Sequence, residues 1–148
     1  LLHTSDEKEI KSITINIWDI WHETNDPTLN ADFFRGIGLM NMGNIKRSIF
    51  YFTRVIEKNP KFAEAWNKRA TAYYMLGQFE LSKLDINQTL LLESRHFGAM
   101  DGMALIFLQE KKFKKAIEIY KKILTIFPKS KQTSLKIQDL LDQINQSA

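Results

Sequence analysis

Three histidines are the side chains in this chain best suited to bind a metal ion or to transfer a proton near neutral pH. They are His3, His22 and His96, and no two of them have the spacing of one helix face or one short loop. A metal site needs several ligands that converge on one point. The chain also has no cysteine, so disulfides, thiolate ligands and cysteine nucleophiles are excluded. The sequence therefore predicts no metal site and no cofactor.

Other residue patterns that support catalysis are also missing from the sequence. No glycine-rich segment has the spacing of a phosphate-binding loop, and Gly98 and Gly102 fall inside an expected helix, where close packing or a bend accounts for them. No serine lies at a strand-to-helix turn, because no segment alternates as a strand does. The carboxylates are dispersed over expected helix surfaces. We therefore expect a protein that is not an enzyme.

Two arginines, Arg35 and Arg69, occupy equivalent positions where an apolar side chain is the norm. A guanidinium that faces a core needs a partner, because an unpaired buried charge is very costly. Asp85, on the next expected helix, is well placed for Arg69, and we predict that the two form a structural ion pair. Tyr51 stands where Arg35 would need an equivalent acid, so its candidate partners are Asp19 and the Tyr51 hydroxyl.

These arginines belong to a 34-residue self-similarity that runs from residue 29 to residue 130. A fixed period of this length indicates one pair of helices that is repeated and stacked. In the middle repeat the apolar spacing predicts helices over 63–76 and 79–92, and Gly77 permits the left-handed turn between them. The third repeat has Glu110 and Lys111 where Leu-Gly is expected. The recurring columns are Gly36, Ala70 and Ala104; Leu39, Tyr73 and Phe107; Ile45, Phe79 and Phe113; Ser48, Ser82 and Ala116; and Phe52, Ile86 and Tyr120.

The predicted fold is an all-α, right-handed α-solenoid of stacked antiparallel helix pairs that forms one domain over residues 1–148. A partial N-terminal repeat fills 1–28, full repeats fill 29–62, 63–96 and 97–130, and a capping helix fills 131–148. Trp18 and Trp21 fall in core columns of the partial repeat, and Asp26 is the expected N-cap of the helix that follows. No apolar run approaches the length of about 18 residues that a membrane helix needs.

Residues 63–93 resemble a tetratricopeptide repeat (TPR), and the two flanking repeats match the same pattern. The signature positions in the middle repeat are Trp66, Ala70, Tyr73, Gly77, Phe79, Ser82 and Ile86. Segments at 17–21, 66–74 and 95–100 also resemble a bacterial TPR subgroup of unsettled function. The resemblance implies a scaffold that binds a protein or peptide partner. Export signals are frequent in that subgroup, which favours the bacterial envelope or periplasm over the cytoplasm.

In TPR proteins the first helix of each repeat lines the inner groove, so the resemblance implies a partner-binding surface on these helices. Many of its residues here are apolar without serving the core columns, which suits an extended peptide or a bound helix. The acidic-tail clamp of heat-shock adaptors falls on Phe33, Ile37, Lys68, Gly98 and Gly102, of which one is cationic, so we do not expect that ligand. The implied groove residues are Phe33, Ile37, Met40, Asn41, Asn67, Lys68, Thr71, Tyr74, Met75, Asp101, Leu105, Leu108 and Gln109.

Two alternatives remain open from the sequence. The net charge of +4 comes from the last third of the chain, mainly from Lys111, Lys112, Lys114, Lys115, Lys121 and Lys122. Such a cluster could bind an acidic partner or nucleic acid, but it lacks arginine forks and free aromatic rings, so a solvated helix face is favoured over nucleic acid. The tryptophan-bearing N-terminal helix could instead pair with a second copy and make the chain a homo-oligomer.

Overall fold

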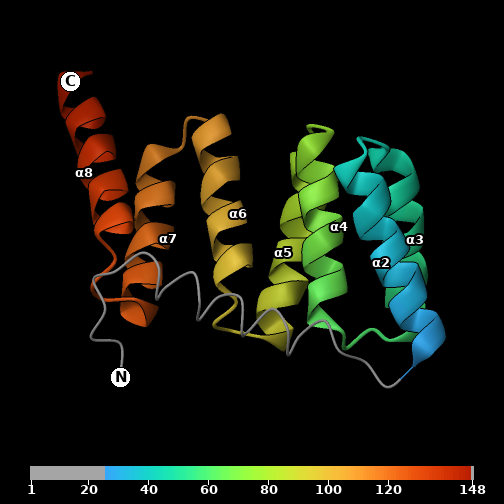
Figure 1. Cartoon of the computed structure of the whole chain (residues 1–148). Coiled ribbons are helices and arrows are strands. Elements are labelled where there is room, and N and C mark those ends of the chain that lie inside the picture. Colours follow the sequence, from blue (N-terminus) through green and yellow to red (C-terminus); the bar gives the residue numbers. More distant parts are fainter. Residues whose placement is uncertain (1–25, 148) are drawn as a thin grey trace. The chain divides into compact units, whose positions relative to one another are not determined.

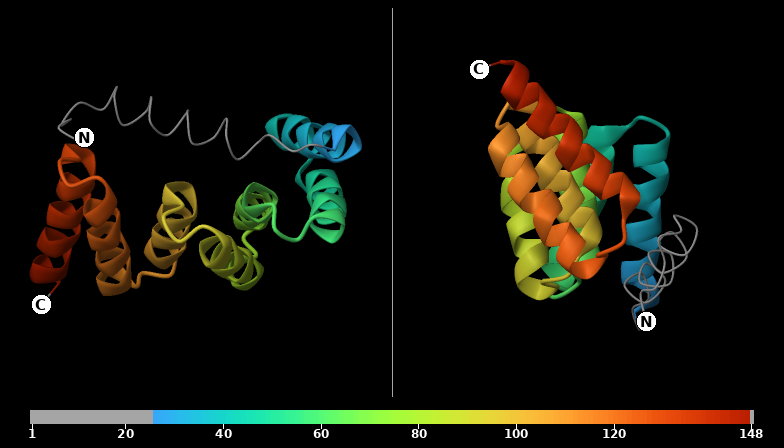
Figure 2. Two further views of the ribbon diagram at one scale, coloured as in Figure 1. Left: turned by 90° about the horizontal axis from the view of Figure 1, so that it is seen from below. Right: turned by 90° about the vertical axis from the view of Figure 1, so that its left-hand side faces the viewer.

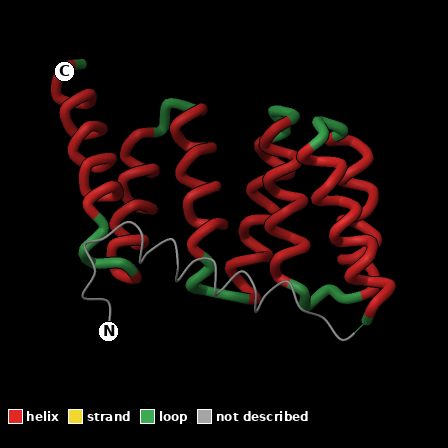
Figure 3. Tube along the Cα trace, viewed as in Figure 1, coloured by secondary structure: helices red, strands yellow, loops and turns green. Residues whose placement is uncertain are grey.

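A computed structural model of the protein describes residues 26–147, which fold into helices joined by short connections (Figures 1 and 3). Within these residues there is no β-strand. The partial N-terminal repeat predicted over 1–28 therefore lies almost entirely outside the described residues. The helices are α2 (Pro27–Asn41), α3 (Ile45–Lys58), α4 (Ala63–Met75), α5 (Phe79–Leu92), α6 (Phe97–Gln109), α7 (Phe113–Ile126) and α8 (Lys131–Gln146).

The chain divides into two compact units. The described part of the first unit is residues 26–99, which hold α2 to α5 and the first residues of α6. The described part of the second unit is residues 100–147, which hold the rest of α6 with α7 and α8. Among the described helices, none is long and apolar enough to cross a membrane.

In the first unit, α2 packs on α3, α4 packs on α5, and α3 packs on α4 (Figure 1). The helix pairs α2–α3 and α4–α5 are two helical hairpins, and Gly43 and Gly77 make the turns within them with φ angles of 83° and 74°. Lys111 holds the equivalent place before α7 with a φ of 58°. The repeat therefore keeps its left-handed turn where the glycine is missing, although this region disfavours a side chain with a Cβ atom.

Small side chains bring the helices of each hairpin close together. A Cβ atom on Gly36 of α2 would lie 2.6 Å from Cε1 of Phe52 on α3, so only glycine fits beneath this ring. In the next hairpin the Ser82 hydroxyl of α5 donates to the Ala70 carbonyl of α4 at 2.7 Å. The small columns of the sequence therefore lie where the paired helices cross most closely.

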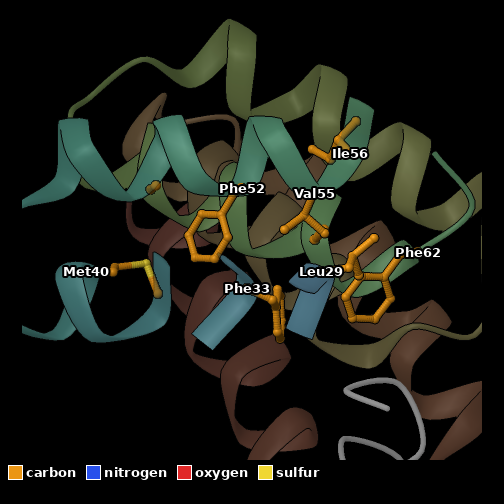
Figure 4. Close-up of a cluster of buried hydrophobic side chains, with 9 residues drawn as sticks. Leu29, Phe33, Met40, Phe52, Val55, Ile56 and Phe62 are labelled. Atoms are coloured by element: carbon orange, nitrogen blue, oxygen red, sulfur yellow. The ribbon is translucent and has the colours of Figure 1, made fainter. Parts of the chain in front are cut away.

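An aromatic cluster forms the core around α2 and α3 (Figure 4). Phe33 is fully buried, and its ring lies 5.9 Å from Phe52 and 4.9 Å from Phe62 between centroids. Trp66 packs against this cluster, and its indole nitrogen donates to the Pro60 carbonyl at 2.8 Å. The connection between α3 and α4 is thereby fixed against both hairpins of the unit.

In the second unit, α7 and α8 lie side by side (Figure 2). Ser130 caps α8 by accepting a hydrogen bond from the Thr133 backbone N–H at 3.2 Å. Tyr120 of α7 is buried, and burial raises the pKa of its phenol to about 12, with the negative charge of Asp101 acting in the same direction. Lys136 of α8 lies 5.3 Å from the Tyr120 ring and pairs with Asp101 at 3.6 Å. These contacts tie α6, α7 and α8 together.

Candidate functional site

The candidate site of the first unit is an open face of α4 that we name the α4 strip: Lys68, Thr71, Tyr74 and Met75. Positions three and four apart lie on one side of a helix, so these side chains share a face. Thr71 is exposed and the Met75 side chain is 53% exposed. Tyr74 is half-buried, with its ring 5.6 Å from that of Phe79. The strip therefore presents a thioether, a hydroxyl and a fixed aromatic ring to its surroundings.

A buried polar network covers the first turns of the same α4 face. Glu64 and His96 are both fully buried, and Nε2 of His96 lies 2.7 Å from Oε2 of Glu64. The Asn67 amide donates to the other oxygen of Glu64 at 3.3 Å. A Cβ atom on Gly98 would lie 3.6 Å from the Asn67 amide nitrogen and 3.3 Å from the His96 ring. The start of α6 therefore packs closely over this end of α4.

The hydrogen bonds of His96 determine which of its nitrogens carries the proton. Nδ1 accepts from the Ala99 backbone N–H at 3.0 Å, so this nitrogen has no proton of its own. Nε2 must then carry the proton, and its N–H donates a hydrogen bond to Glu64. His96 thus serves as the N-cap of α6 and as a donor to a buried carboxylate. The sequence interpretation weighed this histidine only as a metal ligand and missed both roles, although its position just before an expected helix was a usable signal.

Lys68 lies between this network and the open part of the strip. It is half-buried, and burial lowers the pKa of its ammonium, while the nearby Glu64 carboxylate acts in the opposite direction. A cation that is partly removed from water interacts strongly with a polar or negative group that approaches it. Lys68 therefore supplies the positive charge of the α4 strip.

On α2 the structure corrects the predicted groove. Phe33 and Met40 belong to the buried core cluster, and Ile37 packs against it. The reason is that Phe62 folds back over α2 from the α3–α4 connection, which covers the face that the sequence left open. Asn41 is exposed, whereas Asn67 of α4 is buried in the network around Glu64.

The remaining predicted groove residues lie on α6 within the second unit. Asp101 is occupied by its ion pair with Lys136 at 3.6 Å. Leu105 is 37% exposed, Leu108 is half-buried and Gln109 is exposed. These three therefore have accessible surface, whereas Asp101 holds α8.

Arg69 and Asp85, predicted as a structural pair, lie in direct contact. Nε and Nη2 of Arg69 donate to the two carboxylate oxygens at 2.7 and 2.8 Å, and Nη1 donates to the Thr53 hydroxyl at 3.2 Å. The guanidinium also lies 5.2 Å from the Trp66 ring and 5.7 Å from the Tyr73 ring. The hydrogen bonds to Asp85 raise the pKa of Arg69. One side chain thus joins α3, α4 and α5.

Arg35 differs from its equivalent, and the expectation that it faces the core is wrong. Its side chain is exposed, and its guanidinium lies 5.4 Å from the Tyr51 ring. Its Nη1 donates to the Tyr51 hydroxyl at 3.4 Å, and this hydrogen bond lowers the pKa of the phenol. Asp19, the other candidate partner, lies outside the described residues.

The lysine cluster of the sequence lies before and on α7, and its six members are all exposed. Lys112 pairs with Glu110 at 3.6 Å, and the Lys115 ammonium lies 5.7 Å from the Phe107 ring. No group of three histidine, aspartate or glutamate side chains in the described part of the chain could hold a metal ion.

Comparison with protein-family models identifies two matching segments. A tetratricopeptide repeat model matches residues 51–83, which span most of α3, all of α4 and the start of α5. A second tetratricopeptide repeat model matches residues 99–130, which span most of α6 and all of α7.

Similar proteins carry the same kind of repeat. A TPR repeat-containing protein of Rhizobium etli is 25% identical over 139 residues, which cover 94% of this chain and 68% of that protein. The first TPR of Spaghetti (RPAP3), bound to the HSP90 peptide SRMEEVD, superposes with a TM-score of 0.72 at 17% identity over 79% of this chain and 93% of that one. The second TPR domain of human RPAP3, in complex with the HSP70 peptide SGPTIEEVD, gives 0.66 at 24% identity over 74% and 91%.

Proposed function

We propose that this chain, which is a tetratricopeptide repeat (TPR) protein, is a non-catalytic interaction module that binds a peptide or helix of a partner protein. The observation that carries the proposal is the α4 strip, where Thr71 and Met75 are exposed beside the half-buried Tyr74 and Lys68. A helix face that is not packed into the core and that exposes apolar as well as polar side chains is a surface available for a partner.

The strip is rigid at its base, which favours binding. The bonds among Glu64, Asn67 and His96 fix the first turns of α4, and the Arg69–Asp85 pair fixes its other side against α5. A preorganised surface loses less conformational entropy when it binds. Met75 adds a flexible, polarizable side chain that adapts to different ligands. The strip thus combines a fixed frame with one adaptable contact.

Fold neighbours support a peptide as the ligand class. Both RPAP3 domains hold peptides that end in Glu-Glu-Val-Asp. A grip on such a terminal carboxylate needs several converging donors. Of the positions that the resemblance assigns to that grip, Lys68 alone is cationic, and Phe33 is fully buried. We therefore propose a largely apolar or uncharged segment as the ligand rather than an acidic tail.

We propose further binding residues on the strength of their positions in the repeat, each unit taken by itself. In the first unit, Ile37 and Asn41 of α2 are the equivalents of Thr71 and Met75. In the second unit, Leu105, Leu108 and Gln109 of α6 hold the equivalent repeat positions, and we propose them as a separate surface of that unit. Phe33, Met40, Asn67 and Asp101 are left out, because the first two are core residues, the third is buried and the fourth pairs with Lys136.

The test is a selection from a random 16-residue peptide display library on the whole chain. The proposal predicts apolar or uncharged binders that lose affinity at least tenfold with Thr71→Glu and Met75→Glu together. Phe50→Glu is the matched control, since Phe50 is 56% exposed and lies on α3, outside the strip. Binders that keep their affinity for the strip variant, or that are acidic and released by moderate salt, would assign binding to another surface such as the α7 lysines.

A further inference from the structure

The polarity of α5 is reversed relative to an ordinary amphipathic helix. Its buried face carries Ser82, Asp85 and Thr89 together with Ile86. Its exposed face carries Leu81, Leu84 and Leu91, which are 44%, 64% and 80% exposed. A surface helix normally turns its apolar stripe to the core and its polar side to water. The three outer leucines therefore leave apolar area exposed that packing within the first unit does not cover.

The other repeats show that this face is specific to α5. The positions equivalent to Leu81, Leu84 and Leu91 are Arg47, Phe50 and Glu57 on α3, and Lys115, Glu118 and Thr125 on α7. The position equivalent to Gln88 is Arg54 on α3 and Lys122 on α7. The repeat scaffold itself thus does not require leucine at these places, and α5 alone among the three has an apolar residue at all three of them.

The three exposed leucines and the half-buried Gln88 have the spacing of a helix–helix seam. Leu81, Leu84, Gln88 and Leu91 follow one another at intervals of three, four and three, which are the a and d positions of two heptads. We name these four residues the α5 seam. A seam of this kind fits another helix that carries the same spacing. A single polar residue at an a position is the feature that sets register in such pairs.

The charge around the seam fits a second copy of the same surface. The charged residues of α5 are each in an ion pair within the chain: Glu80 with Lys83 at 3.2 Å and Asp85 with Arg69 at 2.7 Å. Two α5 helices can therefore approach without repulsion between like charges. The same approach by two α7 helices would bring exposed lysines together, and by two α3 helices Arg47 and Arg54.

We propose that two copies of this chain associate through the α5 seam in a parallel, two-fold symmetric pair. In this alignment each leucine meets the same leucine of the second copy, and the Gln88 amides meet and can bond to each other. An antiparallel alignment of the same seams sets Gln88 against Leu84, which leaves a polar amide without a partner. The alignment with the paired amides is thus the more stable one.

The seam is short, so the pair is weak. A helix of 14 residues extends about 21 Å and offers two heptads. Its interface lies at the small end of specific protein contacts, for which we expect dissociation constants of roughly 10–100 µM. Sedimentation velocity between about 5 and 500 µM should therefore show the mass change from one chain to two.

A matched pair of variants tests the proposal. Leu84→Glu should remain a single chain at every concentration, whereas Leu135→Glu on α8 should behave as the unchanged protein, since Leu135 is 63% exposed and outside the seam. Thr71→Glu with Met75→Glu should also dimerise normally, which separates this proposal from the proposed function. A single-chain mass for the unchanged protein at all concentrations overturns the proposal, as does normal dimerisation of Leu84→Glu.

Disulfide formation tests the alignment and does not depend on the folding of the leucine variant. The chain has no cysteine, so Gln88→Cys introduces one thiol. Facing residues of a parallel pair come close enough for a disulfide, and mild oxidation should link most of the Gln88→Cys protein into dimers. Glu118→Cys, the α7 equivalent of Leu84, should link at least tenfold more slowly. Equal rates for the two variants, or no linkage of either, contradict the proposed pair.

Discussion

The ion pair between Arg69 and Asp85 permits a quantitative test, because the third repeat holds an apolar version of it. The equivalents of Arg69 and Asp85 there are Met103 and Ile119. The test compares Arg69→Met, Asp85→Ile and the double variant. The two side chains are 16% and 5% exposed, and two hydrogen bonds of 2.7 and 2.8 Å join them.

Removal of either partner leaves a charge that water reaches poorly. Loss of one member of a buried pair costs about 3–5 kcal/mol, and we take about 3 kcal/mol because Arg69 keeps some contact with solvent. The double variant leaves no charge behind, and replacement of a buried pair by apolar residues of similar volume is close to neutral. We therefore expect the free energy of unfolding of the double variant to lie within about 1 kcal/mol of the unchanged protein.

Urea denaturation followed by circular dichroism measures these differences, and each single variant should also lower Tm by about 10 °C. If the two residues acted independently, the double variant would lose about 6 kcal/mol, the sum of the single losses. A double variant that is as unstable as this sum would refute the reasoning. Single variants that lose less than about 1 kcal/mol would also refute it, since that is the value of an exposed pair.

Three further predictions concern single side chains. Lys68→Met should raise Tm at pH 7, because burial lowers the pKa of Lys68 and so makes its charged form costly in the folded state. The unchanged protein gains stability as pH rises through that lowered pKa, so the advantage of the variant should shrink near pH 10. An advantage that stays constant with pH would contradict burial of the charge as its cause. In an absorbance titration at 295 nm, Tyr51 should ionise before Tyr120, which should ionise near pH 12. Tyr120→Phe should remove the step near pH 12, and the stability that this phenol contributes should be lost between about pH 10 and 12. Lys111→Gly should raise stability by about 1 kcal/mol by relieving the positive φ, and unchanged stability would show that lysine is not strained there.

Much of the fold followed from local patterns in the sequence. The prediction of an all-α TPR fold is confirmed, because the period places small residues where helices cross and glycine where the chain reverses. Asp26 accepts hydrogen bonds from the Thr28 and Leu29 backbone N–H groups, as its expected capping role requires. The partner of Arg69 could also be found, since a core-facing charge needs an opposite charge on the adjacent helix. These features depend on neighbours that the repeat itself specifies.

The candidate site was harder to predict, because burial there depends on the connections between helices. Phe33 and Met40 are core residues because Phe62 lies in a connection that folds back over α2. Glu64 and His96 meet only because the chain between α5 and α6 brings the histidine back to the start of α4. A helical period describes each helix face but gives no information on how a connection covers it. The sequence therefore could not tell that Phe33, Met40 and Asn67 are buried.

The central claim is that the α4 strip is the surface that receives a peptide partner. The most direct measurement is the change in backbone amide chemical shifts of the labelled chain upon addition of a peptide selected from the display library. The account predicts that the largest shifts occur at Thr71, Tyr74 and Met75, and that the shifts fade in the Thr71→Glu, Met75→Glu variant. Largest shifts at the α7 lysines or along the α5 seam, with the strip unchanged, would contradict it.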